Sequence, residues 1–382
     1  MKIVFVSNYF NHHQKPVSDR LYERLTDING SYTFVQTEPM DEERIRMGWG
    51  EVFQDTPYLV SYEDDPKKYQ AIIDDADVVI FGGTDDESYI QNRLRMGKVV
   101  WRYSERLYKT GRYKFVSPRG LLKKYLDHTR YNKRRVYLLC SGAYVAGDFR
   151  LVHAYPNKKF RYGYFPEFRE HDVDVLMKHK KNSSKIPRLL WAARMIDWKH
   201  PELPIELAAH LKEAGYKFRM VIVGDGVMAA AMKDYAKELG VKDVVNFLGS
   251  QNPDEVRMHM EKSQIYLTTS DNQEGWGAVI NEAMNSGCAV VANKAMGAAP
   301  YLLQNGNNGL VYRNGNKKQF FAAVKSLLDS PDLCEALGRA AYETIKTTWN
   351  AQVAADRLYE CMVREYMGDP IPYYEDGPLS KI

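Results

Sequence analysis

The chain alternates continuous apolar runs with helix-like segments, and it does so twice. In its first half such runs occur at residues 2–8, 32–37, 76–83, 98–104 and 134–141. Runs without polar alternation are typical of parallel strands that are buried on both faces of a sheet. After a charged stretch at residues 161–188 the rhythm restarts, with runs at residues 188–194, 218–226, 244–249, 264–269 and 288–292. We therefore predict an α/β protein with two successive parallel sheets.

The length agrees with this organisation, since 382 residues are about two domains' worth. We assign residues 1–166 to an N-terminal Rossmann-like domain, 167–187 to a linker, 188–350 to a second Rossmann-like domain and 351–382 to a C-terminal helix and tail. The helical pattern of this last segment covers residues 351–366.

Bulk properties exclude several classes of protein. A net charge of +4 does not by itself indicate a nucleic-acid partner, and four scattered cysteines suit reduced core thiols rather than a disulfide or zinc framework. The first apolar run is too short for a signal peptide, and no stretch approaches the 18 apolar residues of a membrane span. We expect a cytoplasmic protein, or one attached peripherally to the cytosolic face of the cell membrane.

Polar residues with chemical potential follow the predicted strands of the second half. Glu274 and Glu282 flank a Gly-Trp-Gly between an apolar run and a helical pattern. Ligands of parallel sheets bind at the carboxyl ends of the strands, where helix N-termini favour anions. Two glutamates suit such a place if each accepts hydrogen bonds from hydroxyls of a ligand that also carries phosphate.

Three more segments end at the same predicted edge. Arg194 and Lys199 follow one strand, and two cations there would clamp a diphosphate. A glycine turn, "VGDG" at residues 223–226, lets a ligand approach the backbone, and we take Asp225 as a turn residue. The strand end "NFLG" at residues 246–249 could receive a base. Together they predict a pocket for a nucleotide that bears a sugar.

At this point the sequence resembles glycosyltransferase family 4, the retaining enzymes of the GT-B fold. "EGWGAVINEAM" is similar to the E-x7-E signature of that family, and "AARMIDWK" to its GR-x4-K pair, with Ala193 in place of the glycine. The resemblance implies two Rossmann-like domains that face a cleft, with the C-terminal helix packed back on the N-terminal domain. It also implies that Glu274 contacts hydroxyls of the donor sugar and Glu282 the ribose.

Further roles follow from the same resemblance. Arg194 and Lys199 would hold the diphosphate, and we count them with Glu274 as catalytic. The other expected donor-binding residues are Gly224, Phe247, Leu248, Gly249, Gly275, Trp276, Gly277, Ala278 and Val279.

The first half departs from the family pattern. By spacing, His12 and His13 stand where many members have a Gly-Gly pair, and Glu105 stands where many have a histidine. We expect His12 to contact the donor and His13 and Glu105 to be catalytic. Ordinary loop and ion-pair roles stay open for these three residues.

Residues 102–135 are rich in cations and interleaved tyrosines. They suit anionic lipid headgroups or a lipid-linked diphosphate acceptor, while a solvated basic face is the plainer alternative. Nucleic acid fits the charge, but no recognised module accompanies it, so we expect no nucleic-acid partner. The basic residues are Arg102, Arg106, Lys109, Arg112, Lys114, Arg119, Lys123, Lys124, Arg130, Lys133, Arg134 and Arg135.

The sequence thus predicts a retaining hexosyltransferase of cell-surface polysaccharide synthesis, with a nucleotide-sugar donor, expected to be UDP-linked, and a lipid-linked saccharide acceptor. We expect no cofactor and no metal, because the D-x-D at residues 172–174 follows no strand. Two alternatives stay open. One is a soluble transferase that acts on a small acceptor such as a sugar phosphate or polyol, and the other is a non-catalytic nucleotide-binding module.

Overall fold

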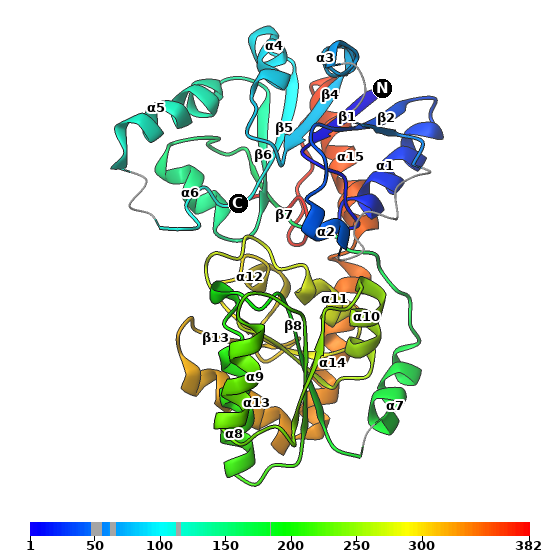
Figure 1. The fold of residues 1–382 in the computed structure, drawn as a ribbon. Coiled ribbons are helices and arrows are strands. Elements are labelled where there is room, and N and C mark those ends of the chain that lie inside the picture. The colour runs from blue at the N-terminus through cyan, green and yellow to red at the C-terminus, as the bar shows by residue number, and fades with distance from the viewer. Residues whose placement is uncertain (47–55, 62–65, 112–115, 184) are drawn as a thin grey trace. The chain divides into compact units, whose positions relative to one another are not determined.

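The computed structural model describes residues 1–46, 56–61, 66–111, 116–183 and 185–382. Within them the chain forms two compact units, each built around one parallel sheet (Figure 1). The N-terminal unit comprises Met1–Glu167 and Trp349–Ile382, and the C-terminal unit comprises Phe168–Thr348. The last segment of the chain therefore returns to the unit that contains the first.

The N-terminal unit holds a seven-stranded parallel sheet in the order β3-β2-β1-β4-β5-β6-β7. All five strands that the sequence predicted here are present, and central strands such as β1 and β4 are almost wholly buried, as a sheet covered on both faces requires. The strands are β1 (Lys2–Ser7), β2 (Ser31–Gln36), β3 (Leu59–Val60), β4 (Val78–Gly82), β5 (Val99–Ser104), β6 (Val136–Ser141) and β7 (Lys159–Tyr162).

Helices cover both faces of this sheet, and one of them comes from the far end of the chain. The helix predicted at residues 351–366 is confirmed as α15, and it packs against α1, where Asp356 accepts hydrogen bonds from Arg20 and Arg24, each at 3.1 Å. The helices are α1 (Lys15–Thr26), α2 (Glu42–Arg46), α3 (Pro66–Asp75), α4 (Ser88–Met96), α5 (Pro118–Asp127), α6 (Val145–Leu151) and α15 (Ala351–Met367).

The C-terminal unit holds a six-stranded parallel sheet in the order β10-β9-β8-β11-β12-β13. Its five longer strands coincide with the predicted runs. The strands are β8 (Arg188–Ala192), β9 (Arg219–Val223), β10 (Val245–Gly249), β11 (Ile265–Thr268), β12 (Ala289–Asn293) and β13 (Leu310–Tyr312). The helices are α7 (Val173–Ser183), α8 (Glu202–Glu213), α9 (Ala229–Glu238), α10 (Pro253–Glu261), α11 (Val279–Asn285), α12 (Ala299–Leu302), α13 (Lys317–Asp329) and α14 (Pro331–Thr347).

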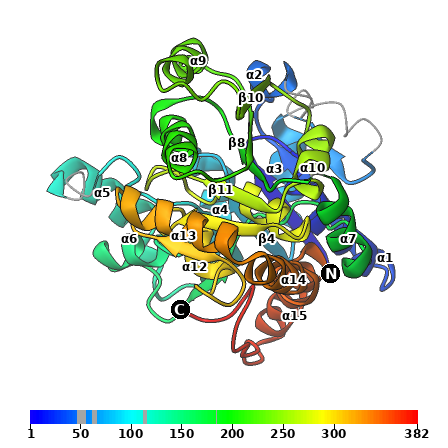
Figure 2. The same cartoon turned by 90° about the horizontal axis from the view of Figure 1, so that it is seen from below.

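Two layers of helices enclose this second sheet (Figure 2). Apolar residues of α8, α9, α13 and α14 form one core with β8, β9 and β12, and α10 contacts β8. Local signals define where these helices begin. Asn252 and Glu255 form a capping box at the start of α10, and Ser330 caps α14 in front of Pro331.

The polar segment that the sequence assigned to a linker is largely part of the C-terminal unit, because residues 168–183 belong to it and contain α7. Lys180 on α7 is buried, and its Nζ donates to the carbonyl oxygens of Met260 at 2.7 Å and Ser263 at 2.6 Å. A cation at these carbonyls stabilises the C-terminal end of α10. Among the described residues, no helix has both the length and the apolarity needed to span a membrane.

Two glycines inside helices predict opposite effects on stability. A Cβ at Gly338 on α14 would lie 2.5 Å from the carbonyl oxygen of Gly287, whereas a Cβ at Gly147 on α6 would meet nothing within 4 Å. Gly147→Ala should therefore raise stability by about 0.5–1 kcal/mol, the usual gain of alanine over glycine in a helix. Gly338→Ala should lower it by about 1–3 kcal/mol through overpacking. Thermal unfolding of both variants tests this, and a rise with Gly338→Ala would contradict it.

Candidate functional site

The C-terminal sheet changes direction between β8 and β11. From β8 the chain adds β9 and β10 on one side and then returns to place β11 on the other side. In open parallel sheets such a switch point leaves a crevice at the carboxyl ends of the two strands, and ligands bind there. The loops that leave β8 and β11 are those that carry Lys199 and Glu274.

Lys199 and Glu274 form an ion pair at this switch point, between Nζ and Oε2. Both side chains are largely shielded, with exposures of 13% and 14%. The Lys199 Nζ also lies 4.3 Å from the centre of the Trp198 ring. The predicted convergence of these two residues is thus present, and their charges compensate each other.

A chain of hydrogen bonds holds Lys199 from the core of the sheet. The indole Nε1 of Trp191 on β8 donates to Oγ1 of Thr269 at 2.8 Å, and that hydroxyl donates to the carbonyl oxygen of Lys199 at 2.6 Å. Trp191 and Thr269 are each only 1% exposed. The backbone that carries the lysine is therefore fixed by a buried strand residue.

A second set of contacts joins the same two loops. Nδ1 of His200 lies 2.9 Å from Glu202, its Nε2 lies 3.5 Å from Asp271, and the backbone N–H of Asp271 donates to the carbonyl oxygen of Trp198 at 3.0 Å. The pKa of His200 is raised, chiefly by the hydrogen bond to Glu202 and also by the charge of Asp271. Loop residues from both strands are thus linked by backbone and by charge.

The glycine turns after β9 and β10 bring backbone close to backbone. The N–H of Gly224 donates to the carbonyl oxygen of Gly249 at 2.7 Å, and that of Ala193 donates to the carbonyl oxygen of Val223 at 3.1 Å. A Cβ at Gly224 would lie 1.9 Å from the carbonyl oxygen of Ala193, and its φ is 127°. No residue other than glycine fits there. The hydrogen bonds of Gly224 and Ala193 bring the carboxyl ends of β8, β9 and β10 together.

Other predicted residues of this edge occupy different environments. Asp225 accepts a hydrogen bond from the N–H of Gly226 at 2.8 Å, which confirms it as a turn residue. Arg194 is exposed on the loop after β8. Phe247 is half-buried against the apolar core below α8 and α9, whereas Leu248 lines a cavity on the opposite face of the sheet.

The loop before α11 is built around Gly277. Its φ is 96°, and a Cβ there would lie 2.5 Å from Cε of Met296 and 3.4 Å from Cγ of Glu274. The Trp276 side chain is fully buried, and its Nε1 donates to the Asn281 side chain at 2.9 Å. Gly275 and Ala278 are buried and Val279 is half-buried. If Trp276 contributes to a ligand site, it does so through its backbone.

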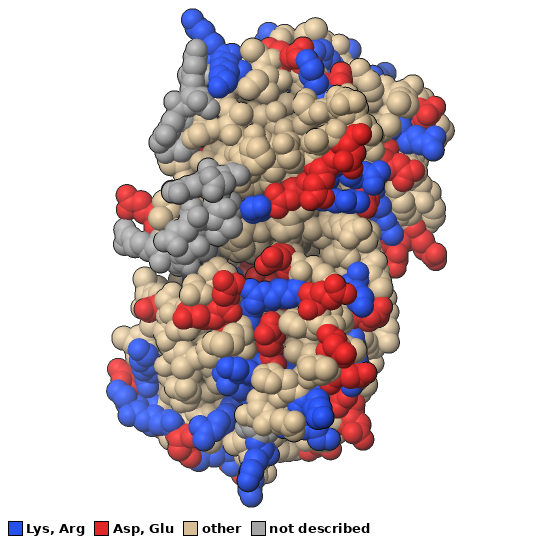
Figure 3. Space-filling view, turned by 90° about the vertical axis from the view of Figure 1, so that its right-hand side faces the viewer, with Lys and Arg blue, Asp and Glu red and all other residues tan. Residues whose placement is uncertain are grey.

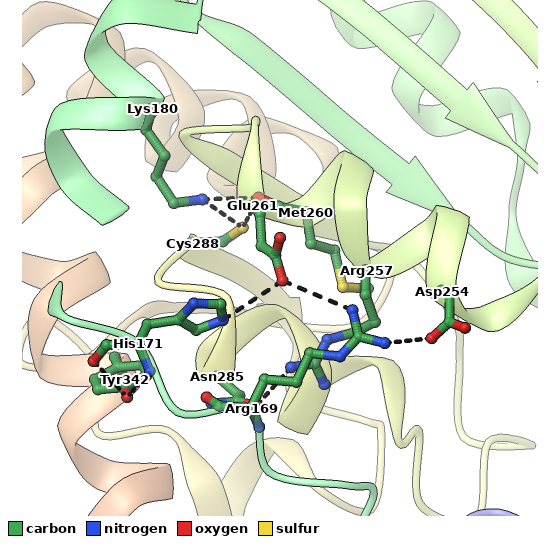
Figure 4. Close-up of polar contacts among 10 residues, drawn as sticks. All are labelled: Arg169, His171, Lys180, Asp254, Arg257, Met260, Glu261, Asn285, Cys288 and Tyr342. Carbon is green, nitrogen blue, oxygen red and sulfur yellow. Dashed lines mark hydrogen bonds and ion pairs between the residues drawn. The ribbon is translucent and has the colours of Figure 1, made fainter. Parts of the chain in front are cut away.

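Polar contacts of Asn285 link α11 to Arg169, which precedes α7, and to Arg257 on α10 (Figure 4). The Asn285 side chain bonds both the N–H of Arg169, at 2.8 Å, and its carbonyl oxygen, at 2.9 Å, and it also accepts from Arg257 at 2.5 Å. Burial raises the pKa of Glu282, one turn earlier on α11, and the charges of Arg257 and Arg169 oppose that rise. Glu282 and Glu274 therefore have different electrostatic surroundings.

The N-terminal unit gathers its own predicted residues at the end of β1. The ring centres of His12 and His13 lie 3.9 Å apart. The His13 ring is stacked on the Tyr164 ring, with 6.0 Å between the ring centres. The Tyr164 hydroxyl donates to Glu105 at 2.6 Å, and Glu105 also pairs with Lys109. Burial, followed by Arg44, lowers the pKa of His12 to about 4, and burial, His12 and Arg44 lower that of His13 further below its ordinary value. Both imidazoles are neutral at pH 7.

The predicted basic surface is not continuous. Arg102 is buried and makes two 2.7 Å hydrogen bonds to Glu87, Arg106 pairs with the buried Asp148, and Arg135 pairs with Glu365. Arg102 and Arg106 are used inside the fold, so counting these two in an open patch was wrong, whereas the side chain of Arg135 is 44% exposed. Tyr113, Phe115 and the predicted basic residues Arg112 and Lys114 lie outside the described residues.

Several residues of the site were missed by sequence reasoning. Trp191, Thr269 and Asn285 read as core or strand residues, because nothing in the sequence reveals which loop they touch. His200 directly follows Lys199, and a histidine between two acidic partners could have been suspected only with the loops in place. Tyr164 lay in a stretch interpreted as the start of a polar connection.

Comparison with known proteins finds a family model that matches part of the chain. Residues 173–344 match the model of "Glycosyl transferases group 1". The matched region contains β8 to β13 and therefore the whole switch-point edge with Lys199 and Glu274.

Curated relatives of this group 1 region are similar over part of their length. A D-inositol 3-phosphate glycosyltransferase of Corynebacterium aurimucosum is 31% identical over 159 residues, which are 40% of this chain and 37% of the relative. A GDP-mannose-dependent alpha-(1-6)-phosphatidylinositol monomannoside mannosyltransferase of Mycobacterium tuberculosis is 26% identical over 178 residues, 45% of this chain and 46% of the relative. The chain thus matches less than half the length of these two relatives.

Solved structures extend the likeness to the whole fold. A glycosyltransferase from Rickettsia africae has a TM-score of 0.70 at 15% identity, covering 97% of this chain and 99% of that one. Anabaena HepE in complex with UDP and glucose has a TM-score of 0.68 at 14% identity, covering 95% and 99%. The chain therefore has the two-domain GT-B fold, as the sequence predicted.

The contacts of His200 predict a pH dependence of stability. A histidine whose folded-state pKa is raised stabilises the fold fully below its unfolded pKa, about 6.5, and this contribution is lost as pH rises through the folded value. His200→Gln should therefore lower the unfolding midpoint most near pH 6, and the difference from the wild type should shrink toward pH 9.

Thermal unfolding of both proteins between pH 6 and pH 9 measures this difference. His179→Gln, at an exposed position of α7, serves as the matched control and should show no such trend. A difference between wild type and His200→Gln that is the same at every pH would refute the role of the Glu202 and Asp271 contacts.

Proposed function

We propose that this protein is a glycosyltransferase that takes a hexose from a nucleotide-sugar, most plausibly a uridine-linked one. The observation that carries the proposal is the shielded ion pair of Lys199 and Glu274 at the switch point of the sheet, inside the region that matches the group 1 model. Complexes of the structurally similar HepE with UDP-glucose support a uridine donor. The mycobacterial relative is named as GDP-mannose-dependent, so a guanosine-linked donor is the alternative.

The diphosphate would bind at Arg194 and Lys199. Without a ligand, Glu274 compensates the charge of Lys199. A diphosphate would bind Lys199 together with Glu274. Its hydrogen bonds to charged nitrogens are stronger than hydrogen bonds between neutral groups. The N–H groups at the start of α11 would add to this, but α11 has only 7 residues, so we assign most of the charge compensation to the two cations.

The sugar and the nucleoside would extend from the diphosphate in two directions. Glu274 lies beside Gly277 at the loop before α11, where it can accept hydrogen bonds from sugar hydroxyls. Glu282, held on α11 by the contacts of Asn285, would accept from the ribose. The backbone of the Gly224 turn and of Phe247–Gly249 would line the base.

The charge pairing of Glu274 bears on the mechanism. A double displacement needs a free carboxylate beneath the sugar ring. Glu274 instead pairs with the cation that would hold the leaving group, so we place it on the leaving-group side and propose retention by attack on the same face. Arg194 and Lys199 would stabilise the departing diphosphate as its charge grows, without a metal or cofactor.

Acceptor binding is proposed for the N-terminal unit, at the end of β1. His13 is neutral there, and it stacks on the tyrosine that bonds Glu105. A neutral imidazole and a carboxylate are groups that can orient hydroxyls of a saccharide. His12, on the same loop, would approach the donor.

Helix α5 favours a lipid-linked acceptor over a small soluble one. None of its residues is buried, and Leu122 and Tyr125 are 59% and 53% exposed. Leu121 and Leu126 lie on the same face, while Arg119 and Lys123 flank it. Exposed apolar faces beside cations are typical of helices that lie in the interface of an anionic membrane. We therefore propose that α5 attaches the enzyme to the cytosolic face of the membrane.

The donor assignment predicts the effect of losing Lys199. Lys199→Met should weaken binding of UDP and of the UDP-sugar by at least tenfold, because one charge-assisted contact is worth about 1.5–3 kcal/mol. Isothermal titration with UDP measures this. Lys318→Met, which removes an exposed lysine of α13, is the control and should bind as the wild type does. Equal affinity of all three proteins would sink the assignment.

Turnover of the same proteins tests the mechanism. The product should keep the anomeric configuration of the donor, which NMR reads directly, and enzyme quenched during turnover with a slow fluorinated donor should carry no sugar. A hexose adduct on Glu274 would overturn same-face attack and make that carboxylate the nucleophile. Slow donor hydrolysis without acceptor would argue against a non-catalytic module.

The role of α5 predicts vesicle binding. Leu122→Ser with Tyr125→Ser should reduce sedimentation with anionic vesicles by tenfold or more, because two apolar side chains lose their burial in the interface. Ile28→Ser with Val175→Ser removes equally exposed apolar residues elsewhere and should change nothing. High salt should weaken the remaining binding, since the flanking cations are screened. If both double variants sediment like the wild type, α5 is not the attachment surface.

A further inference from the structure

A cavity of about 560 Å³ opens on the C-terminal unit away from the switch-point edge. It is lined at the amino-terminal starts of β8, β9 and the segment before β10, by Arg188, Arg219 and Lys242, and by His259 on α10. Helix α10 contacts β8, and the cavity opens beside this helix, over β9 and β10. Its volume falls in the range of small-molecule sites.

The charge of this cavity is one-sided. Its four basic residues face a single acid, Asp243, and that carboxylate already binds Nζ of Lys212 at 2.6 Å. Among the described residues, the side chains of Arg219 and Lys242 have neither a hydrogen bond nor an ion pair. Figure 3 shows Lys and Arg interspersed with Asp and Glu over the face that it draws.

Arg188 is the anchor of the lining. Its guanidinium donates to Nδ1 of His259 at 2.8 Å, while its Nε is shielded from solvent and has no hydrogen-bond partner. Burial lowers the pKa of Arg188, and burial together with Arg188 and Lys262 lowers that of His259. A shielded guanidinium that has only a neutral imidazole as partner lacks a counter-charge, which a bound anion would supply.

The remaining wall of the cavity is apolar. Val221, Val244 and Leu248 contribute to it, beside the exposed amide of Asn246. Cations at one end and aliphatic side chains along the floor suit a ligand with a charged head and an apolar or planar body.

We propose that this cavity is a second binding site, for a phosphate ester, in which Arg188, Arg219 and Lys242 bind the phosphate. The three cations lie at the opposite end of the strands from Arg194 and Lys199, so the phosphate does not share the proposed diphosphate site, although the cavity reaches Leu248, whose backbone is proposed to line the base. The inference rests on the cavity alone and does not depend on the donor assignment.

The test uses a protein in which the cations of the other edge are removed, Arg194→Ser with Lys199→Ser, so that phosphate cannot bind there. Isothermal titration of this protein with phenyl phosphate and with inorganic phosphate should detect one site, with tighter binding of phenyl phosphate because of the apolar floor. Adding Arg219→Ser and Lys242→Ser should weaken both by at least tenfold. Both side chains are exposed, so the fold should be unaffected, which circular dichroism checks.

The matched control adds Arg313→Ser and Lys318→Ser, which remove two exposed cations elsewhere in the same unit. This variant should bind phenyl phosphate as its parent does. The proposal is overturned if the parent binds neither probe, or if binding survives loss of Arg219 and Lys242. It is also overturned if the control pair weakens binding as much as the cavity pair does, because the attraction would then be only general charge.

Discussion

The central strands of a covered parallel sheet leave most of their chemistry to the two ends of the strands. The backbone hydrogen-bonding groups of β8, β9 and β11 are used by neighbouring strands, and most of their side chains are buried. Polar side chains of these strands therefore meet a ligand mainly where the strands end. In the C-terminal unit Lys199 and Glu274 lie at the carboxyl ends of the strands, and Arg188 and Arg219 lie at their amino ends. Everything proposed for this unit follows from that restriction.

The Lys199–Glu274 pair satisfies two shielded charges at once. A shielded cation without a partner is costly, and Glu274 supplies the counter-charge for Lys199. The Trp191–Thr269 hydrogen bonds meanwhile keep the lysine backbone in place. Arg188 in the second cavity has no such carboxylate, which is why an external anion is inferred there.

Much of the fold could be predicted from the sequence, because short continuous apolar runs between helical segments are typical of buried parallel strands. The strands that were missed, β3, β7 and β13, are short and lie at sheet edges. β7 contains Lys159 and Arg161, and it owes its pairing on one side to the chain end, where the N–H of Leu379 donates to Arg161 and that of Ile382 to Lys159. Such contacts come from residues more than two hundred positions away, and no local pattern announces them.

The meeting of Lys199 and Glu274 at one end of the sheet was predictable from the sequence, whereas most of the partners of these two residues were not. Spacing was enough to place Lys199 near Glu274, since both follow strands that adjoin at a switch point. The basic surface predicted at residues 102–135 was wrong for Arg102 and Arg106, because they pair with the shielded carboxylates of Glu87 and Asp148. A run of cations in a sequence does not reveal which of them face inward. The exposure of Leu121, Leu122 and Leu126 on α5 was not predicted either.

The two glutamates of the E-x7-E spacing illustrate how position separates roles that residue type leaves equal. Glu274 stands in a loop, paired with a cation, so its charge is stabilised and it suits hydroxyls near a developing negative charge. Glu282 stands on α11, where burial raises its pKa and the charges of Arg257 and Arg169 oppose that rise. A shielded carboxylate of this kind is stabilised by hydrogen-bond donors. The eight-residue separation places one carboxylate before the helix and the other on it, so a single ligand that spans the helix start would meet both.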